Sequence, residues 1–347
     1  MHLVQLDLSQ LSCTSTIYVS DSHNPWFNLA FEDWIFRKTD PRAVVLYMYR
    51  NDPSVIIGRN QNPWKEINLH QLNDLGIPFV RRKSGGGTVY HDLGNTNYCV
   101  FVPREQFERR INAELVARAL NEVKIPANVN ERNDICVEGF KVSGSAFKLV
   151  NARAYHHGTM LIDAKLGDLR GVLGTTKHTL ITKGVPSVSS PVRNLVQWNS
   201  DFGHEKFVGA VSEEFKKTYG EFEEVQVTRV NESELERNEY VKGVSDELQS
   251  WDWQWGSTPE FTHDIEGSFP FGDISLHITS RHALITSASL TRPPRNPAWY
   301  RSAEHFVSLL EGDRYGTLEG VEKALEGMEG IKTERLRTLV EWLKKEM

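Results

Sequence analysis

RRKSGGGTVYHDLGN, residues 81–95, is the stretch from which the rest of this sequence is best interpreted. Two arginines and a lysine stand directly before a serine and three glycines. Glycine has no Cβ, so successive backbone N–H groups can form a concave surface that attracts anions, and nearby arginines add forked donors. The apolar residues on both sides are typical of strands. We therefore predict a strand, an anion-binding glycine loop and a second strand. The alternative is an ordinary glycine-rich turn with solvated basic residues.

The composition narrows the class of protein. The chain has 347 residues, of which 39% are hydrophobic, which is enough for one large and one small domain. A net charge of −6 gives no general attraction to nucleic acid or to acidic membranes. Cys13, Cys99 and Cys136 form no CxxC pair, which argues against a disulfide framework and favours a reducing compartment. No apolar run approaches the roughly 20 residues that cross a bilayer. The first residues, with Asp7 and no Lys or Arg, are a poor targeting signal as they stand.

Hydrophobic spacing predicts the order of the main elements. Asn24 and Pro25 should cap and begin a helix. Residues 44–49 should form a strand with a hairpin partner at 54–58, and residues 97–102 another strand. Trp251, Trp253 and Trp255 alternate, which predicts an extended segment with three rings on one side. The remaining expectations are helices near 107–123 and 207–219, hairpins over 134–163, a polar surface crossing at 231–243, strands at 274–278 and 283–290, and three short final helices.

Lys141 is the second candidate for chemistry. On a strand it would face away from both Phe140 and Val142, into a cleft or into solvent. An ammonium group is a compact charge suited to bridging a carboxylate and an α-phosphate. The alternative is an ordinary surface lysine. Asp134 could hold Mg²⁺ or orient Lys141, although taken alone it is better explained as a turn residue.

His156 and His157 could form a metal pair, but adjacent residues on a strand point to opposite faces. No carboxylate or cysteine completes a zinc set at suitable sequence spacing, so a structural or hydrogen-bonding role is favoured. The sequence contains no GxSxG elbow, no P-loop, and no GxGxxG after a first strand. The polar set of Arg82, Ser84 and Lys141 with the glycines and the nearby aspartate suits a reaction in which a carboxylate meets a nucleotide phosphate.

Several motifs together resemble the lipoate–protein ligase A and lipoyltransferase family. They are NPWFNLAFE at 24–32, GRNQNPWKE at 58–66, the glycine loop at 81–95, RND at 132–134, KVSGSA at 141–146, HHGT at 156–159 and SVSSPVRNL at 187–195. Their order and spacing also resemble that family. Each motif is weak alone, but together they are highly specific and cover most of residues 17–200.

The resemblance implies an α+β fold in which a mixed β-sheet is flanked by helices, as in biotin ligases and class II synthetases, with a small C-terminal accessory domain. The expected division is a catalytic domain at 1–250 and an accessory domain at 251–347. The implied reaction uses ATP and Mg²⁺ to activate lipoate, or octanoate, as an acyl-adenylate. The acyl group then passes to a lysine of a lipoyl domain.

The resemblance also assigns site residues. Lys141 would be catalytic by electrostatic means. The adenylate would contact Arg82, Gly87, Thr88, Val89, Tyr90, Asp134 and Lys141. Lipoate would contact Ser84, Gly85, Gly86, His91, Lys141, His157 and Gly158. Asp134 is the candidate Mg²⁺ ligand.

The implied partners are the lipoyl domains of 2-oxoacid dehydrogenase E2 subunits and the glycine cleavage H protein. No nucleic acid, no membrane and a monomeric state are expected. Eukaryotic relatives work in mitochondria, so that location is expected for a eukaryotic source and a cytoplasmic one otherwise.

Two alternatives stay open. One is a lipoyl or octanoyl transferase that takes a preformed acyl donor, although RND and HHGT here look more like the ATP-using ligases. The other is a non-catalytic binder of lipoate or a nucleotide. A biotin ligase is disfavoured because a GRGR-type loop is missing, and an RNA binder is disfavoured by the acidic balance.

Overall fold

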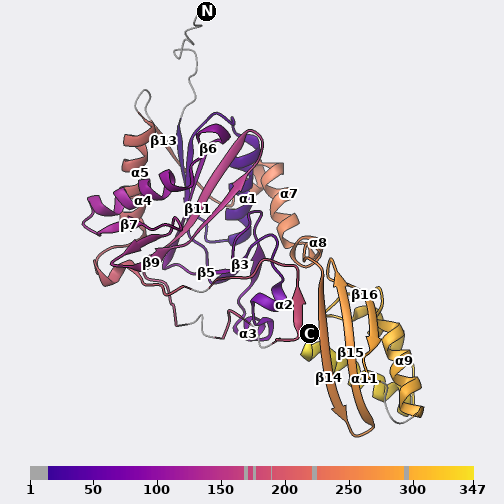
Figure 1. Ribbon diagram of the computed structural model, residues 1–347. Coiled ribbons are helices and arrows are strands. Elements are labelled where there is room, and N and C mark those ends of the chain that lie inside the picture. Colours follow the sequence, from indigo (N-terminus) through magenta and orange to yellow (C-terminus); the bar gives the residue numbers. More distant parts are fainter. Residues whose placement is uncertain (1–14, 168–170, 175–176, 189, 221–224, 293–296) are drawn as a thin grey trace, which may run out of the picture. The chain divides into compact units, whose positions relative to one another are not determined.

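The computed structural model describes residues 15–167, 171–174, 177–188, 190–220, 225–292 and 297–347 (Figure 1). The described residues form two compact units. The first contains those up to Gly58, within Ile77–Leu169 and within Val188–Gln249. The second contains those within Arg59–Gly76, Arg170–Ser187 and Ser250–Met347. The predicted catalytic domain at 1–250 and accessory domain at 251–347 were defined by function, so that division stays a prediction. By packing, two earlier segments also belong to the second unit.

A mixed sheet of six strands lies at the centre of the first unit, in the order β10-β11-β6-β2-β1-β13. β1 runs parallel to β2 and β13, and the pairs β2–β6, β6–β11 and β11–β10 are antiparallel. The bounds are β1 Thr16–Ser20, β2 Val45–Tyr49, β6 Asn95–Pro103, β10 Ser145–Leu149, β11 Arg153–Leu161 and β13 Gln226–Val230.

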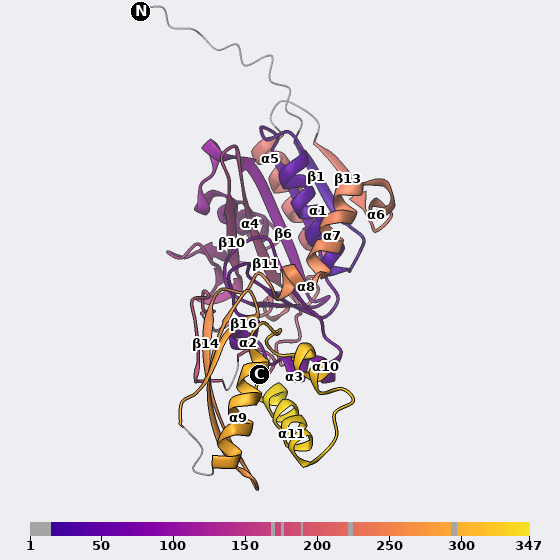
Figure 2. The same ribbon diagram turned by 90° about the vertical axis from the view of Figure 1, so that its right-hand side faces the viewer.

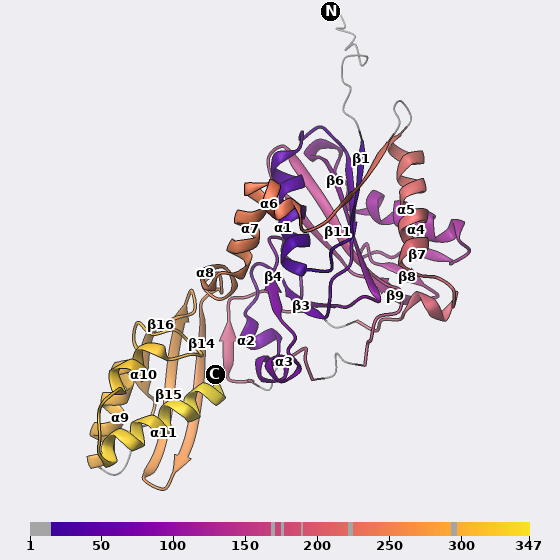
Figure 3. The same cartoon turned by 180° about the vertical axis from the view of Figure 1, so that it is seen from behind.

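Helices cover both faces of this sheet (Figure 1, Figure 3). On one face α4 (Arg109–Glu122) and α5 (His204–Tyr219) enclose the main apolar core with Leu46, Met48 and Val100. On the other face lie α1 (Pro25–Lys38) and α7 (Glu239–Gln249). Successive strand residues alternate between these faces, so Tyr47 and Tyr49 point toward α1, where they contact Asn28 and Glu32.

The start of α1 confirms the sequence expectation. The Asn24 side chain accepts hydrogen bonds from the backbone N–H groups of Trp26 and Phe27, and Pro25 occupies the first helical position. Two short three-stranded sheets complete the first unit. They are β4-β3-β5, with β3 Ser54–Ile57, β4 Phe79–Arg81 and β5 Val89–His91, and β7-β8-β9, with β7 Ala127–Val129, β8 Ile135–Val137 and β9 Phe140–Ser143. A 3₁₀ turn at Arg104–Gln106, another at Leu195–Gln197, and α6 (Glu234–Arg237) are its remaining elements.

The second unit has a four-stranded sheet in the order β12-β14-β15-β16, with α9 (Pro297–Leu310) and α11 (Ile331–Glu346) against one face (Figure 2, Figure 3). Its strands are β12 Leu180–Thr182, β14 Phe261–Phe269, β15 Gly272–Arg281 and β16 Leu284–Leu290. Its other helices are α2 Pro63–Glu66, α3 Leu69–Leu75, α8 Trp251–Gln254 and α10 Glu319–Leu325. Its core includes Trp64 and Leu180 besides residues of the C-terminal segment.

Two sequence expectations were wrong. The strand at 54–57 does not form a hairpin with 45–49; it pairs with β4 and β5 instead. The tryptophan segment is a short helix, α8, because the Ser250 side chain caps it by accepting from the Trp253 N–H. The segment at 231–243 lies largely at the surface, as predicted, and contains α6 and the first part of α7, which were not predicted. Within the described residues, no helix has the length and apolar character needed to span a membrane.

Candidate active site

The glycine loop joins β4 to β5, and both strands pair with β3. This confirms the predicted strand, loop and strand. Gly86 has a φ of +90°, which disfavours residues with a Cβ. A Cβ built there would lie 2.9 Å from Arg82 Nη2 and 3.2 Å from Ala146 Cβ. The close approach of the loop to these two neighbours therefore requires glycine at position 86.

The Arg82 guanidinium lies under the loop and is bonded to it. Nη2 donates to the carbonyl oxygens of Gly85 (2.6 Å) and Gly87 (2.8 Å), and Nη1 donates to that of Ile56 (3.1 Å). Nε donates to Ser84 Oγ at 3.0 Å. Burial lowers the pKa of Arg82 to about 10, so it remains a cation at neutral pH. The arginine is therefore bonded to neutral oxygens of its own loop and of Ile56.

Ser84 continues this network toward α1. Its Oγ lies 2.9 Å from His157 Nε2, and His157 Nδ1 lies 3.1 and 3.2 Å from the two carboxylate oxygens of Glu32. A carboxylate only accepts, so Nδ1–H donates to Glu32, and Nε2 accepts from the serine hydroxyl when the ring is neutral. Tyr49 donates a further hydrogen bond to Glu32. Ser84, His157 and Glu32 are all buried.

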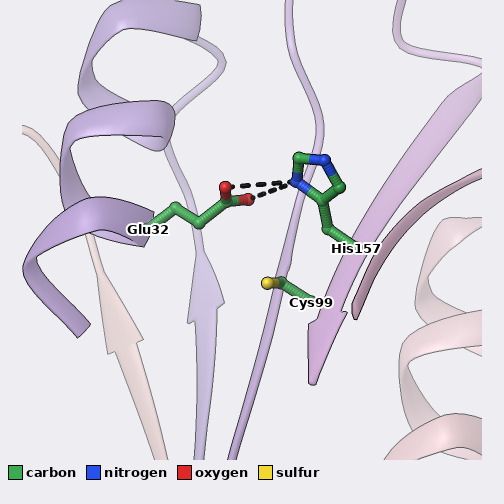
Figure 4. A group of neighbouring side chains, drawn as sticks. All are labelled: Glu32, Cys99 and His157. Atoms are coloured by element: carbon green, nitrogen blue, oxygen red, sulfur yellow. Dashed lines mark hydrogen bonds and ion pairs between the residues drawn. The ribbon is translucent and has the colours of Figure 1, made fainter. Parts of the chain in front are cut away.

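The register of β6 and β11 brings a thiol to the same place. Cys99 pairs directly with His157, and both side chains lie on the face of the sheet that α1 covers. Figure 4 shows Glu32 reaching from the helix toward the His157 ring, with the Cys99 sulfur beside them. Burial raises the pKa of the Cys99 thiol well above its ordinary value, with the Glu32 charge as the next cause.

His156 points to the opposite face, as strand alternation predicts. Its ring packs against Tyr98 and Phe147, and its Nε2 lies 2.8 Å from Ser145 Oγ. The two histidines are therefore no metal pair, as expected. No carboxylate or cysteine stands at zinc-site spacing from His157 in the sequence, but Glu32 and Cys99, from distant parts of the chain, lie beside it in the structure.

Lys141 stands on β9, and its Nζ forms an ion pair with Asp134 Oδ1 at 2.8 Å. The lysine side chain keeps 22% of its surface exposed. Asp134 follows a turn in which Asn133 has a φ of 62°, so it is both a turn residue and the partner of the lysine. Gly144 lies close by, since a Cβ built there would be 3.6 Å from Lys141 Cε. The contact that the predicted orienting role of Asp134 requires is present, and the role itself stays a prediction.

His91, at the end of β5, is neutral and has one unsatisfied nitrogen. Asn51 Nδ2 donates to its Nδ1 at 2.9 Å, so the proton lies on Nε2. That Nε2 is buried and has no hydrogen-bond partner among the described residues. Burial lowers the pKa of His91 to about 3, with the charges of Arg82 and His157 contributing less. A buried N–H donor without an acceptor is costly, so a ligand oxygen at this point would stabilise the site.

The other predicted residues are spread around this network. Thr88 and Val89 lie at the exit of the loop, and Tyr90 is a buried member of β5 opposite Val55. Gly158 lies beside His157 but packs on Tyr98, since a Cβ there would be 2.5 Å from the phenol ring. The structure thus brings the glycine loop, Arg82, Ser84 and His157 into one network.

Glu32, Tyr49 and Cys99 were not predicted from the sequence as site residues. A signal for Glu32 was present in the helix spacing. It stands four residues after the buried Asn28, on a helix whose buried positions are mostly apolar. A carboxylate on a buried face requires a partner, and here that partner is His157.

Comparison with known proteins defines the class of protein. The model of the lipoyl protein ligase A/B catalytic domain matches residues 24–216. The chain is also 39% identical over 265 residues to the lipoate-protein ligase A of Psychrobacter cryohalolentis, which covers 76% of this chain and 78% of that protein. This chain therefore belongs to the lipoyl protein ligase A/B family.

Solved structures agree with this assignment. LipL1 of P. falciparum, in complex with lipoate, is 26% identical with a TM-score of 0.61, and the match covers 95% of this chain and 99% of that one. A lipoate-protein ligase A bound with ATP is 24% identical with a TM-score of 0.58 over 69% of this chain and 98% of that one. The second likeness shows the fold alone. Together these matches confirm the predicted α+β class and mixed sheet.

Proposed function

We propose that this protein is a lipoate–protein ligase, which activates lipoate with ATP and transfers the lipoyl group to a lysine of a lipoyl domain. Membership of the family and the likeness to lipoate-protein ligase A support this function. The observation that carries the chemistry is the Lys141–Asp134 ion pair, in the same unit as a glycine loop bonded to a buried arginine. Lys141 supplies a cation that Asp134 holds in place. The glycine loop can present backbone N–H groups to an anion, and Arg82 can present its guanidinium.

In the first step, a lipoate carboxylate oxygen attacks the α-phosphorus of ATP, and the bond to pyrophosphate breaks. Two anions must approach each other, so the step needs positive charge that is already in place. Lys141 would supply it, held in position by Asp134 at 2.8 Å. Arg82 would exchange its bonds to the Gly85 and Gly87 carbonyls for ligand oxygens.

In the second step, the acceptor lysine attacks the carbonyl carbon of lipoyl-AMP, AMP leaves, and the amine loses a proton to solvent. Lys141 acts electrostatically in both steps and forms no covalent bond. The unsatisfied His91 Nε2–H is a donor suited to a carboxylate or anhydride oxygen. We place the acyl group near Ser84 and His157, with the adenylate at the glycine loop and Lys141.

The residues fit Mg²⁺ in its usual arrangement with nucleotides, in which one or two carboxylates and substrate phosphates hold the ion. Asp134 is the carboxylate that could bind it here, and the ion would neutralise phosphate charge. Mg²⁺, the glycine cleavage H protein as an acceptor, the monomeric state and a mitochondrial location for a eukaryotic source are parts of this proposal. A lipoyl domain from an E2 subunit is the acceptor class with most support, since a solved relative is described together with its E2 lipoyl domain.

Two assays test the function. Purified protein with ATP, lipoate and Mg²⁺ should release pyrophosphate, and a purified lipoyl domain should gain the mass of one lipoyl group. Lys141→Ala is the matched negative control, because it removes the cation of the ion pair. Transfer from supplied lipoyl-AMP without pyrophosphate release would support the transferase alternative. Binding of lipoate or ATP with neither activity would support the non-catalytic alternative.

A further inference from the structure

Glu32, Cys99 and His157 meet in the interior of the first unit, although α1, β6 and β11 supply one residue each (Figure 4). One ligand atom from each residue lies within 4.8 Å of the other two. Their relative exposures are 3%, 0% and 9%, so water competes little for these atoms. The ligase chemistry described above uses neither Glu32 nor Cys99.

A thiolate, an imidazole and a carboxylate form a donor set that suits zinc. Glu32 and a Cys99 thiolate carry two negative charges, so a divalent ion would make the buried cluster neutral. Zinc–ligand bonds of about 2.0–2.3 Å place tetrahedral ligand atoms roughly 3.3–3.8 Å apart. His157 Nδ1 and Glu32 Oε1, at 3.1 Å, are already near this separation, so closing the cluster requires Cys99 Sγ to approach them by at most about 1 Å.

The neighbours of the cluster are those expected around a metal site. Tyr49 donates to Glu32 Oε2 at 3.2 Å, and Ser84 Oγ lies 2.9 Å from His157 Nε2. Partners of this kind orient ligating carboxylates and imidazoles. His157 Nδ1 is the nitrogen that faces Glu32, so it is the one placed to coordinate.

We propose that this cluster is an inhibitory binding site for zinc, or for a similar borderline-soft divalent ion, with Glu32, Cys99 Sγ and His157 Nδ1 as protein ligands. Zinc would displace the thiol proton into solvent. The Nδ1 proton would leave that nitrogen and His157 Nε2 would become protonated, so the ring would donate to Ser84 instead of accepting. Reversing the hydrogen bond between His157 and Ser84 changes the polar network that we assign to the acyl site. The proposal that zinc inhibits the enzyme therefore rests on the proposed function.

Binding is tested directly on the metal-stripped full-length protein. Equilibrium dialysis with zinc should give one tight site, and titration with cobalt should give a thiolate-to-cobalt charge-transfer band. Cys99→Ala should lose the band and bind zinc at least about tenfold more weakly. Cys136→Ala is the matched control, because Cys136 is the other buried free thiol among the described residues. It should behave like the wild type.

Inhibition is tested with octanoyl-AMP as the supplied donor, so that neither ATP nor the sulfur atoms of a lipoyl donor bind the zinc. Zinc should slow transfer to a lipoyl domain by the wild type and by Cys136→Ala, and a chelator should restore it. Cys99→Ala and the second variant Cys99→Ser should resist zinc. The proposal is overturned if Cys99→Ala and the wild type bind zinc equally, or if both are inhibited equally. If the metal-free chain transfers nothing, the proposed function fails, while dialysis and the cobalt band still decide the metal site.

Discussion

Acid should destabilise the first unit through two histidines that folding keeps neutral. Burial lowers the pKa of both His91 and His156 to about 3, with nearby positive charge adding to the effect. The folded pKa lies below the unfolded value of 6.5, so the unfolded chain binds more protons between about pH 6.5 and pH 3. The free energy of unfolding therefore falls as the pH falls through this window and is unaffected by these groups above it.

The loss of unfolding free energy depends on the difference between the unfolded pKa of 6.5 and the pH of the experiment. At about pH 5 the gap is roughly one and a half units, and each unit corresponds to about 1.36 kcal/mol. Each histidine should therefore lower the free energy of unfolding by about 2 kcal/mol at that pH. This is a large part of the 5–15 kcal/mol that stabilises a typical domain.

The assay compares wild type with His156→Asn at about pH 7.5 and about pH 5. Hydrogen exchange in peptides from β6 and β11 reports the opening of the first unit. The variant should be less stable at the higher pH, because the packing against Tyr98 and Phe147 is lost. The difference from wild type should shrink by about 2 kcal/mol at the lower pH. His23→Asn, which removes a partly exposed imidazole of the same unit, is the control. Parallel pH profiles for wild type and His156→Asn would refute the reasoning.

Three further predictions concern single positions. Lys141→Ala should lower both pyrophosphate release and transfer from supplied lipoyl-AMP by at least about 10²-fold, because a fixed positive charge is lost; an unchanged transfer rate would exclude the proposed role. Gly86→Ala should cost about 1–2 kcal/mol in thermal unfolding, since φ is +90° and the new Cβ would lie 2.9 Å from a guanidinium nitrogen. Gly85→Ala, where a Cβ meets nothing within 4 Å, should leave stability nearly unchanged, and equal losses would argue against strain at the loop. Gly158→Ala should cost about 1–3 kcal/mol in urea unfolding by overpacking, because its Cβ would lie 2.5 Å from the Tyr98 ring; a stability equal to wild type would show that the ring moves freely.

The spacing of hydrophobic residues predicted where helices and strands lie far better than it predicted which strands pair. The helix after Asn24, the strand through Cys99 and the loop at 81–95 were predicted correctly because each rests on local spacing or capping. The partner of the strand at 54–57 was wrong, since an apolar run does not specify which neighbouring strand it pairs with. The tryptophan segment was wrong because a spacing of two fits a strand, whereas the Ser250 cap that starts a helix was overlooked.

The candidate site was predictable where one motif supplied several residues. The glycine loop and the pair of Lys141 and Asp134 were found from short stretches, and the structure places the pair in direct contact. The cluster around His157 was not found, because Glu32 and Cys99 lie far from it in sequence and only the sheet register and the packing of α1 unite them. No local pattern carries that information.

The bonding of Arg82 to its own loop has a consequence for discrimination between ligands. Carbonyl oxygens of its own loop already satisfy the guanidinium. A small anion such as free phosphate would have to replace the loop carbonyls as the acceptor for Arg82. Its binding free energy would therefore be only the difference between the new hydrogen bonds and the lost ones. The displaced carbonyls of Gly85 and Gly87 would be left without a donor. A ligand that also engages Lys141 and the His91 N–H can compensate for that loss. The loop carbonyls thus act as internal competitors of any anion that binds Arg82.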